Sequence, residues 1–121
     1  MMAKENILAD KSEDFALRVV DIVKKLQYKR EQVLSNQLLR AGTSIGANIA
    51  EAQYAQSRDD FISKMSIALK ECAETNYWLR LLSRAGYFEN IPSSAILSED
   101  CNSLQSLLVA TVKTAKQRKD Y

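Results

Sequence analysis

The sequence predicts an all-α fold, an antiparallel up-down-up-down four-helix bundle, on three observations. Four segments carry apolar residues at alternating spacings of three and four, the repeat of a helix with one buried face. The 121 residues include only three Gly and one Pro, too few for the turns of an all-β chain. Apolar residues make up 46% and charged residues 26%, so a core can form. The length fits a single domain over residues 1–121.

The first helix is expected over residues 10–27. Asp10 is a candidate N-cap, and Glu13 stands three residues later, in the reciprocal position of a capping box. The apolar positions of this segment are Phe15, Val19, Ile22 and Leu26.

The second helix is expected over residues 31–55, with an apolar seam that a single amide interrupts. Asn48 stands where the rhythm requires an apolar residue, and a buried amide without partners costs about 1–3 kcal/mol. We therefore expect Asn48 to hydrogen-bond another helix near Glu71 or Glu74, and we favour a role in helix register over a ligand site. The apolar positions are Leu34, Leu38, Ala41, Ile45 and Ala52.

The third helix is expected over residues 58–85. The hydroxyl of Ser57 can cap its start, with Asp60 three residues later, and Gly86 can end it in the left-handed conformation that glycine adopts freely. Its apolar seam is unbroken and consists of Phe61, Met65, Ala68, Cys72, Thr75, Leu79 and Leu82.

The fourth helix is expected over residues 94–117, with Ser93 or Ser94 as its cap after Pro92. The connections between the four segments are short, and short connections place successive helices antiparallel. The apolar seam of this segment consists of Leu97, Cys101, Leu104, Leu108, Thr111 and Ala115.

The residue types that most enzymes need are missing from this chain. It contains no His, which excludes the Glu-x-x-His pairs of di-iron bundles, and we find no nucleophile–base pair, phosphate loop or metal-ligand spacing. We expect neither enzymatic activity nor a cofactor. Glu51, Glu71 and Glu74 are interpreted as solvated surface charges, although an enzyme that uses them across a subunit interface stays a third alternative.

Cys72 and Cys101 each stand on an apolar seam, so we expect buried, reduced thiols. No apolar run approaches the roughly 20 residues of a membrane span, and no signal peptide is visible at the N-terminus. We therefore expect a cytoplasmic protein without a membrane partner.

Basic residues gather where the helices are expected to end, and they have two interpretations. Cations at helix C-termini interact favourably with the helix dipole, which explains them without a ligand. Alternatively, in the up-down topology the ends of the first and third helices share one end of the bundle, which could hold the phosphates of RNA or DNA. The candidates at that end are Lys24, Lys25, Lys29, Arg30, Arg80 and Arg84.

The evidence from charge is weak for one chain. The net charge is +2 and the pI is near 8.5. A further basic set is expected at the opposite end, and acidic residues near the basic end can neutralise part of it. The opposite set is Lys113, Lys116, Arg118 and Lys119, and the acidic residues are Glu31, Glu89, Glu99 and Asp100.

Two patterns exceed what one bundle needs and indicate self-association. Ile67, Trp78 and Leu81 stand at i, i+11 and i+14 on the back of the third helix, where a monomer would expose them. Gly42 and Gly46 form a small-residue stripe that indicates close approach of another backbone. That backbone could belong to the same bundle or to another subunit.

Two sequence runs resemble the four helix bundle protein family, also called the 23S rRNA-intervening sequence protein family. The chain carries a Ser-Ile-x-x-Asn-Ile-x-Glu run in the second helix and an Ile-Ala run followed by Glu in the third. Ala52 departs from the glycine that many relatives carry at the end of the first run. The matching residues are Ser44, Ile45, Asn48, Ile49, Glu51, Ile67, Ala68 and Glu74.

The resemblance implies a bundle that assembles into a ring-like homopentamer. Some members are encoded within intervening sequences of bacterial 23S rRNA genes. Related accessory proteins of diversity-generating retroelements are pentamers that bind nucleic acid and a reverse transcriptase. The leading hypothesis is therefore a non-enzymatic homo-oligomer that acts as a nucleic-acid-binding or accessory interaction protein. The alternative is an oligomeric protein-binding adaptor without a nucleic-acid role.

Overall fold

A computed structural model describes the backbone of residues 3–118 and the side chains of residues 7–118. Within that part of the chain the structure consists of four helices without a strand, which confirms the all-α prediction. The helices are α1 (Ala3–Tyr28), α2 (Val33–Ala52), α3 (Arg58–Arg84) and α4 (Ser93–Gln117).

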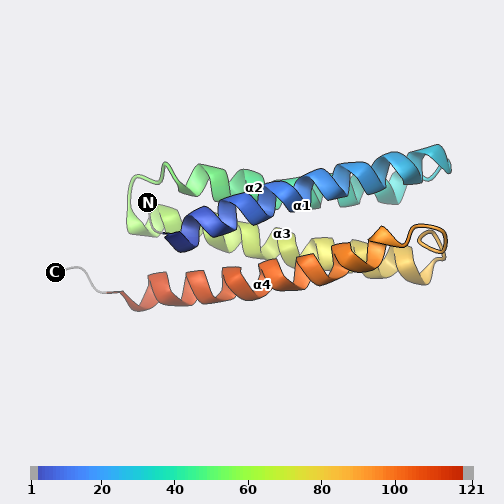
Figure 1. The fold of residues 1–121 in the computed structure, drawn as a ribbon. Coiled ribbons are helices and arrows are strands. Elements are labelled where there is room, and N and C mark those ends of the chain that lie inside the picture. The colour runs from blue at the N-terminus through green and yellow to red at the C-terminus, as the bar shows by residue number, and fades with distance from the viewer. Residues whose placement is uncertain (1–2, 119–121) are drawn as a thin grey trace.

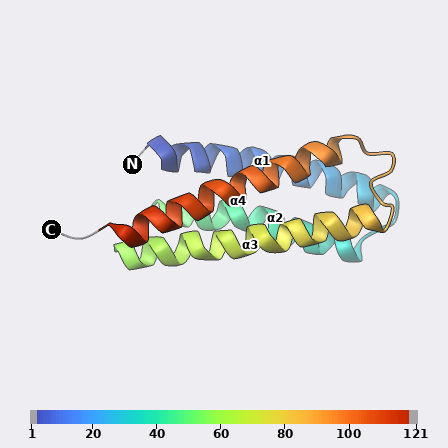
Figure 2. The same ribbon diagram turned by 90° about the horizontal axis from the view of Figure 1, so that it is seen from below.

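The four helices lie side by side along one long axis (Figure 1). α1 and α3 run toward the end that holds the 28–33 and 84–93 connections, and α2 and α4 run back (Figure 1). α2 packs against α1 and α3, and α4 packs against α3 and α1, so that the helices surround a single core (Figure 2). None of the helices in the described part of the chain is long and apolar enough to cross a membrane.

The core is built from the apolar seams that the periodicity predicts. Phe15, Met65 and Leu97 are completely buried, and most of the other seam residues of the four helices are buried with them. The periodicity of α2 places Asn48 in the core, but in the structure its neighbour Ile49 takes that core position and is completely buried. The amide is thereby turned to the margin of the core, where it is half-buried.

The expected start of the first helix is wrong. α1 already begins at Ala3, so Asp10 and Glu13 lie inside the helix and form no capping box. The sequence before Asp10 carries Leu8, which is completely buried in the core, and this packing extends the helix beyond the local capping signal.

The start of α3 agrees with the prediction, since the Ser57 hydroxyl accepts a hydrogen bond from the backbone N–H of Asp60 at 3.0 Å. The start of α4 differs. Its N-cap is Pro92, which provides no side-chain hydrogen bond, and Ser93 and Ser94 both lie within the helix. α2 is shorter than the expected 31–55 and ends at Ala52.

α1 and α3 end in the same backbone motif, with one residue in the left-handed conformation. Gly86 has φ +89° and donates its backbone N–H to the carbonyl of Ser83, and the N–H of Tyr87 donates to the carbonyl of Leu82 at 3.1 Å. After α1 the same position is held by Arg30 with φ +68°, and the N–H of Glu31 reaches back to Leu26 at 3.0 Å. A side chain in this conformation is strained, so Arg30 stands where glycine is favoured.

Candidate functional site

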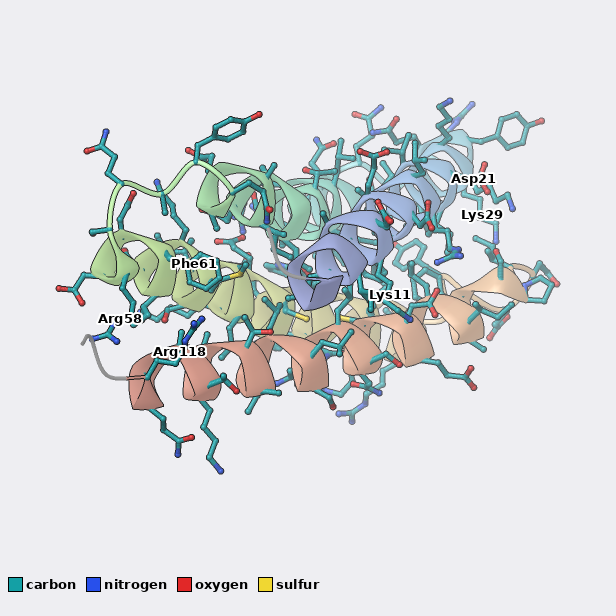
Figure 3. All side chains as sticks on the ribbon, turned by 60° about the vertical axis from the view of Figure 1, so that its left-hand side comes forward. Lys11, Asp21, Lys29, Arg58, Phe61 and Arg118 are labelled. Carbon is teal, nitrogen blue, oxygen red and sulfur yellow. The ribbon has the colours of Figure 1, made fainter. Side chains whose placement is uncertain are left out.

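The C-terminal ends of α1 and α3 lie at the same end of the bundle (Figure 1). All six basic candidates at this end are exposed to solvent, and Lys29 projects from the chain just beyond α1 (Figure 3). They are Lys24, Lys25, Lys29, Arg30, Arg80 and Arg84. The C-terminal end of α4, with Lys113, Lys116 and Arg118, lies at the opposite end (Figure 1). Lys119 falls outside the described residues.

Five of the six basic residues line two recesses at this end, and Arg30 lines neither of them. Lys24, Lys25 and Lys29 line one, together with Asn90 of the connection between α3 and α4. Arg80 and Arg84 line a groove of about 570 Å³ between α3 and α4.

The α3–α4 groove is otherwise mostly polar. The amide of Asn76 on α3 donates to Gln105 on α4 at 2.9 Å and bridges its two walls. The Arg80 guanidinium lies 5.9 Å from the ring centroid of Tyr77, which is a cation–π distance. Cations, amides and hydroxyls of this kind are the groups that contact phosphates in nucleic-acid interfaces.

Two of the four acidic residues expected to neutralise this end are engaged elsewhere. The Glu31 carboxylate accepts the backbone N–H groups of Leu34 at 2.9 Å and Ser35 at 2.8 Å, so it caps α2 and is only 8% exposed. Asp100 forms an ion pair with Arg18 across α1 and α4 at 2.7 Å. Glu89 and Glu99 are exposed, and Asp21 of α1 forms an ion pair with Lys25 at 3.4 Å, so part of the positive charge at this end is compensated.

A second candidate surface follows the edge between α2 and α3. Arg40 of α2 forms ion pairs with Glu71 at 3.3 Å and with Glu74, which are one turn apart on α3. The Trp78 indole N–H donates to the same Glu74 carboxylate at 2.9 Å.

Farther along the same edge, Lys64 of α3 lies 3.6 Å from Glu51 of α2. The three glutamates are therefore paired with cations. Within the described residues no group of three or more metal-binding side chains is found.

The expected contact of Asn48 with another helix is wrong. The Asn48 amide donates to the carbonyl oxygen of Ser44, one turn earlier on the same helix, at 2.9 Å. The Ser44 hydroxyl in turn donates to the carbonyl of Arg40 at 2.6 Å. Arg40, and not Asn48, reaches Glu71 and Glu74. The sequence already indicates this, because Arg40 stands four residues before Ser44 and eight before Asn48, on the same face of α2.

The apolar candidates on the back of α3 are less exposed than expected. Ile67 is 40% exposed, but Trp78 and Leu81 are half-buried, and Trp78 packs against the core. A tryptophan at this position is therefore accommodated by one chain through its ring packing and its bond to Glu74.

The glycine stripe faces α1 of the same chain. A Cβ atom on Gly42 would lie 2.9 Å from Cγ2 of Val19, and one on Gly46 would lie 3.4 Å from the backbone oxygen of Ser12. The small residues thus allow α1 to approach α2 closely. Of the two alternatives that the sequence leaves open for the neighbouring backbone, the structure shows the one within the same bundle.

The residues of the two sequence runs have divided roles in this geometry. Ile45, Ile49 and Ala68 are completely buried, while Ser44, Asn48, Glu51, Ile67 and Glu74 lie along or beside the α2–α3 edge. One pattern therefore specifies both the core and a surface.

Comparisons with known proteins agree with this pattern. A crystal structure at 1.70 Å resolution of a protein with unknown function from the S23 ribosomal protein family of Bacteroides thetaiotaomicron VPI-5482 is similar to this chain. The two are 48% identical, with a TM-score of 0.86, over 91% of this chain and 98% of that chain. A comparison with curated proteins gives no match. The family model of the 23S rRNA-intervening sequence protein matches residues 4–110, and the chain therefore belongs to that family.

Proposed function

We propose that this chain is a non-enzymatic, cytoplasmic, homo-oligomeric bundle that binds RNA or DNA without sequence preference through its basic end. The observation that carries the proposal is the gathering of six exposed Lys and Arg side chains at one end, where Glu31 and Asp100 are engaged in other pairings. Repetition of this end around a symmetric assembly would turn a weak charge per chain into a multivalent surface. A pentamer is the assembly that the family resemblance implies.

The contacts are expected to go to phosphates, because aromatic groups near this end are few. Tyr28 is 91% exposed beside the lysines of α1, and Tyr87 is half-buried in the following connection. Base stacking therefore contributes little, and affinity falls steeply as salt rises, since each phosphate contact releases counterions.

The test is a binding titration of mixed-sequence RNA and duplex DNA at low and at physiological salt. Two double variants matched in charge serve as the comparison. The first variant, Arg80→Glu/Arg84→Glu, reverses the charge of the two arginines in the groove between α3 and α4. The second, Lys113→Glu/Lys116→Glu, reverses the charge of two exposed lysines at the opposite end. The proposal requires that the first variant lose binding and that the second keep it. A triple variant, Lys24→Glu/Lys25→Glu/Lys29→Glu, tests the other recess in the same way.

Absence of binding at low salt, or equal binding by both double variants, would favour the alternative function, an oligomeric protein-binding adaptor. The α2–α3 edge supports this alternative, because Ile67 is exposed on the same face of α3 that carries the half-buried Trp78 and Leu81 three to four turns further on.

For self-association, we propose that Ile67, Trp78 and Leu81 are covered by a neighbouring subunit. Ile67→Glu should reduce the molar mass measured by light scattering to that of a monomer at unchanged helical content. Val33→Glu places the same charge at another exposed apolar position, 76% exposed at the start of α2, and should stay assembled. A monomeric wild-type protein at micromolar concentration contradicts the oligomer directly.

A further inference from the structure

Two thiols from different helices meet in the middle of the core. Cys72 of α3 and Cys101 of α4 are both completely buried, and their Sγ atoms lie 3.8 Å apart. The Cys72 Sγ is 3.4 Å from the carbonyl oxygen of Cys101, and the Cys101 Sγ is 3.6 Å from the carbonyl oxygen of Cys72. These reciprocal contacts mean that the two backbones approach closely at this crossing.

The two sulfur atoms are in van der Waals contact at 3.8 Å, and a covalent bond requires a closer approach. A disulfide has an S–S distance of about 2.0 Å, so the sulfur atoms must approach by roughly 1.8 Å. Rotation of the two side chains about their Cα–Cβ bonds, together with an inward movement of the helices, has to provide this approach.

We propose that Cys72 and Cys101 form an intramolecular redox site, which a low-molecular-weight disulfide such as oxidised glutathione converts to a bond between α3 and α4. In the first step one of the two cysteine thiolates attacks one sulfur of glutathione disulfide, forms a mixed disulfide and releases one glutathione thiolate. In the second step the other cysteine, having lost its proton to solvent, attacks the protein sulfur of that mixed disulfide and releases the second glutathione as a thiolate. Two protein thiols are oxidised to one disulfide, and one glutathione disulfide is reduced to two thiols.

In the closed bundle the two thiols form one coupled pair with shifted pKa values. A hydrogen bond from the Cys101 thiol lowers the pKa of Cys72 despite its burial. The same interaction raises the pKa of Cys101, and burial raises it further. Because both sulfurs are covered in the closed bundle, the reagent reaches them when α4 opens locally. Both exchanges take place in this opened state, and the helices close again after glutathione has left.

The experiment measures the equilibrium and not the rate, since access to buried thiols limits the rate. The reduced protein is equilibrated with glutathione redox buffers in native conditions and in denaturant, quenched with acid, alkylated and analysed by intact mass. The expected native product has lost two hydrogen atoms and takes up no alkylating reagent. Its effective thiol concentration should exceed that of the denatured chain by about tenfold or more, because the fold holds the sulfurs together. The thermal midpoint should rise on oxidation and return with reductant.

Cys72→Ser and Cys101→Ser are matched controls, each with one thiol. They should form no internal bond, and the same buffers should leave their thermal midpoint unchanged. The proposal is overturned if the native wild-type protein keeps two alkylatable thiols under oxidising conditions. It is also overturned if the effective concentration is no higher than in denaturant, or if the bonds that form join separate chains.

Discussion

The contact between α1 and α2 predicts opposite effects of the same substitution at two glycines one turn apart. Gly42→Ala would place a Cβ atom 2.9 Å from Cγ2 and 3.0 Å from Cγ1 of Val19, which is shorter than real contacts of this kind. Val19 is β-branched and completely buried, so it cannot rotate away freely. Gly46→Ala would place its Cβ atom 3.4 Å from Ser12, close to ordinary van der Waals contact.

The magnitudes follow from two opposing terms. Replacing glycine by alanine inside a helix stabilises it by roughly 0.5–1 kcal/mol at either position. Overpacking at Gly42 costs about 1–3 kcal/mol, which exceeds that gain. We therefore expect Gly42→Ala to be destabilised by up to about 2 kcal/mol and Gly46→Ala to be stabilised by roughly 0.5–1 kcal/mol.

The assay is denaturant unfolding followed by circular dichroism at one fixed protein concentration, since self-association makes stability depend on concentration. The double variant Gly42→Ala/Val19→Ala removes Cγ1 and Cγ2 of Val19, the two atoms closest to the new Cβ, and leaves only the Val19 Cβ at 3.4 Å. In the Val19→Ala background the Gly42→Ala change should therefore become stabilising, with a coupling of about 1–3 kcal/mol. If Gly42→Ala were as stable as Gly46→Ala in the wild-type background, the close contact between α1 and α2 would be refuted.

Three further substitutions test helix ends and the α2–α3 edge by the same unfolding assay. Arg30→Gly should stabilise the fold by about 1 kcal/mol, because it relieves a side chain at φ +68°; a loss of stability would contradict the backbone motif after α1. Glu31→Ala should lower the free energy of unfolding by about 0.5–2 kcal/mol, because the backbone N–H groups of Leu34 and Ser35 lose their acceptor. As a control, Glu89→Ala at an exposed position should change it by no more than about 0.5 kcal/mol. Asn48→Leu should change stability by less than about 1 kcal/mol in an isolated chain, because the amide bonds its own helix; a larger loss would indicate a partner across the α2–α3 edge.

The sequence by itself determined the helices and the residues that face the core. The 3.6-residue period of apolar side chains fixes which face of each helix is buried, and local capping chemistry fixes some of the ends. The Ser57 cap and the glycine at Gly86 were readable because their hydrogen bonds are made within a few residues of chain. The prediction that α1 begins at Asp10 is wrong, because a capping residue expresses only a local preference and the packing of Leu8 against the core outweighs it.

Only the tertiary structure decided which neighbour each surface meets. Periodicity assigns a residue to one side of its own helix, but the rotation and spacing of helices against one another depend on all side chains packed between them. For that reason the sequence left open whether Gly42 faces α1 or another subunit, and it did not pair Arg40 with Glu74. It placed Cys72 and Cys101 on core seams, but only the close crossing of α3 and α4 brings their sulfurs within 3.8 Å.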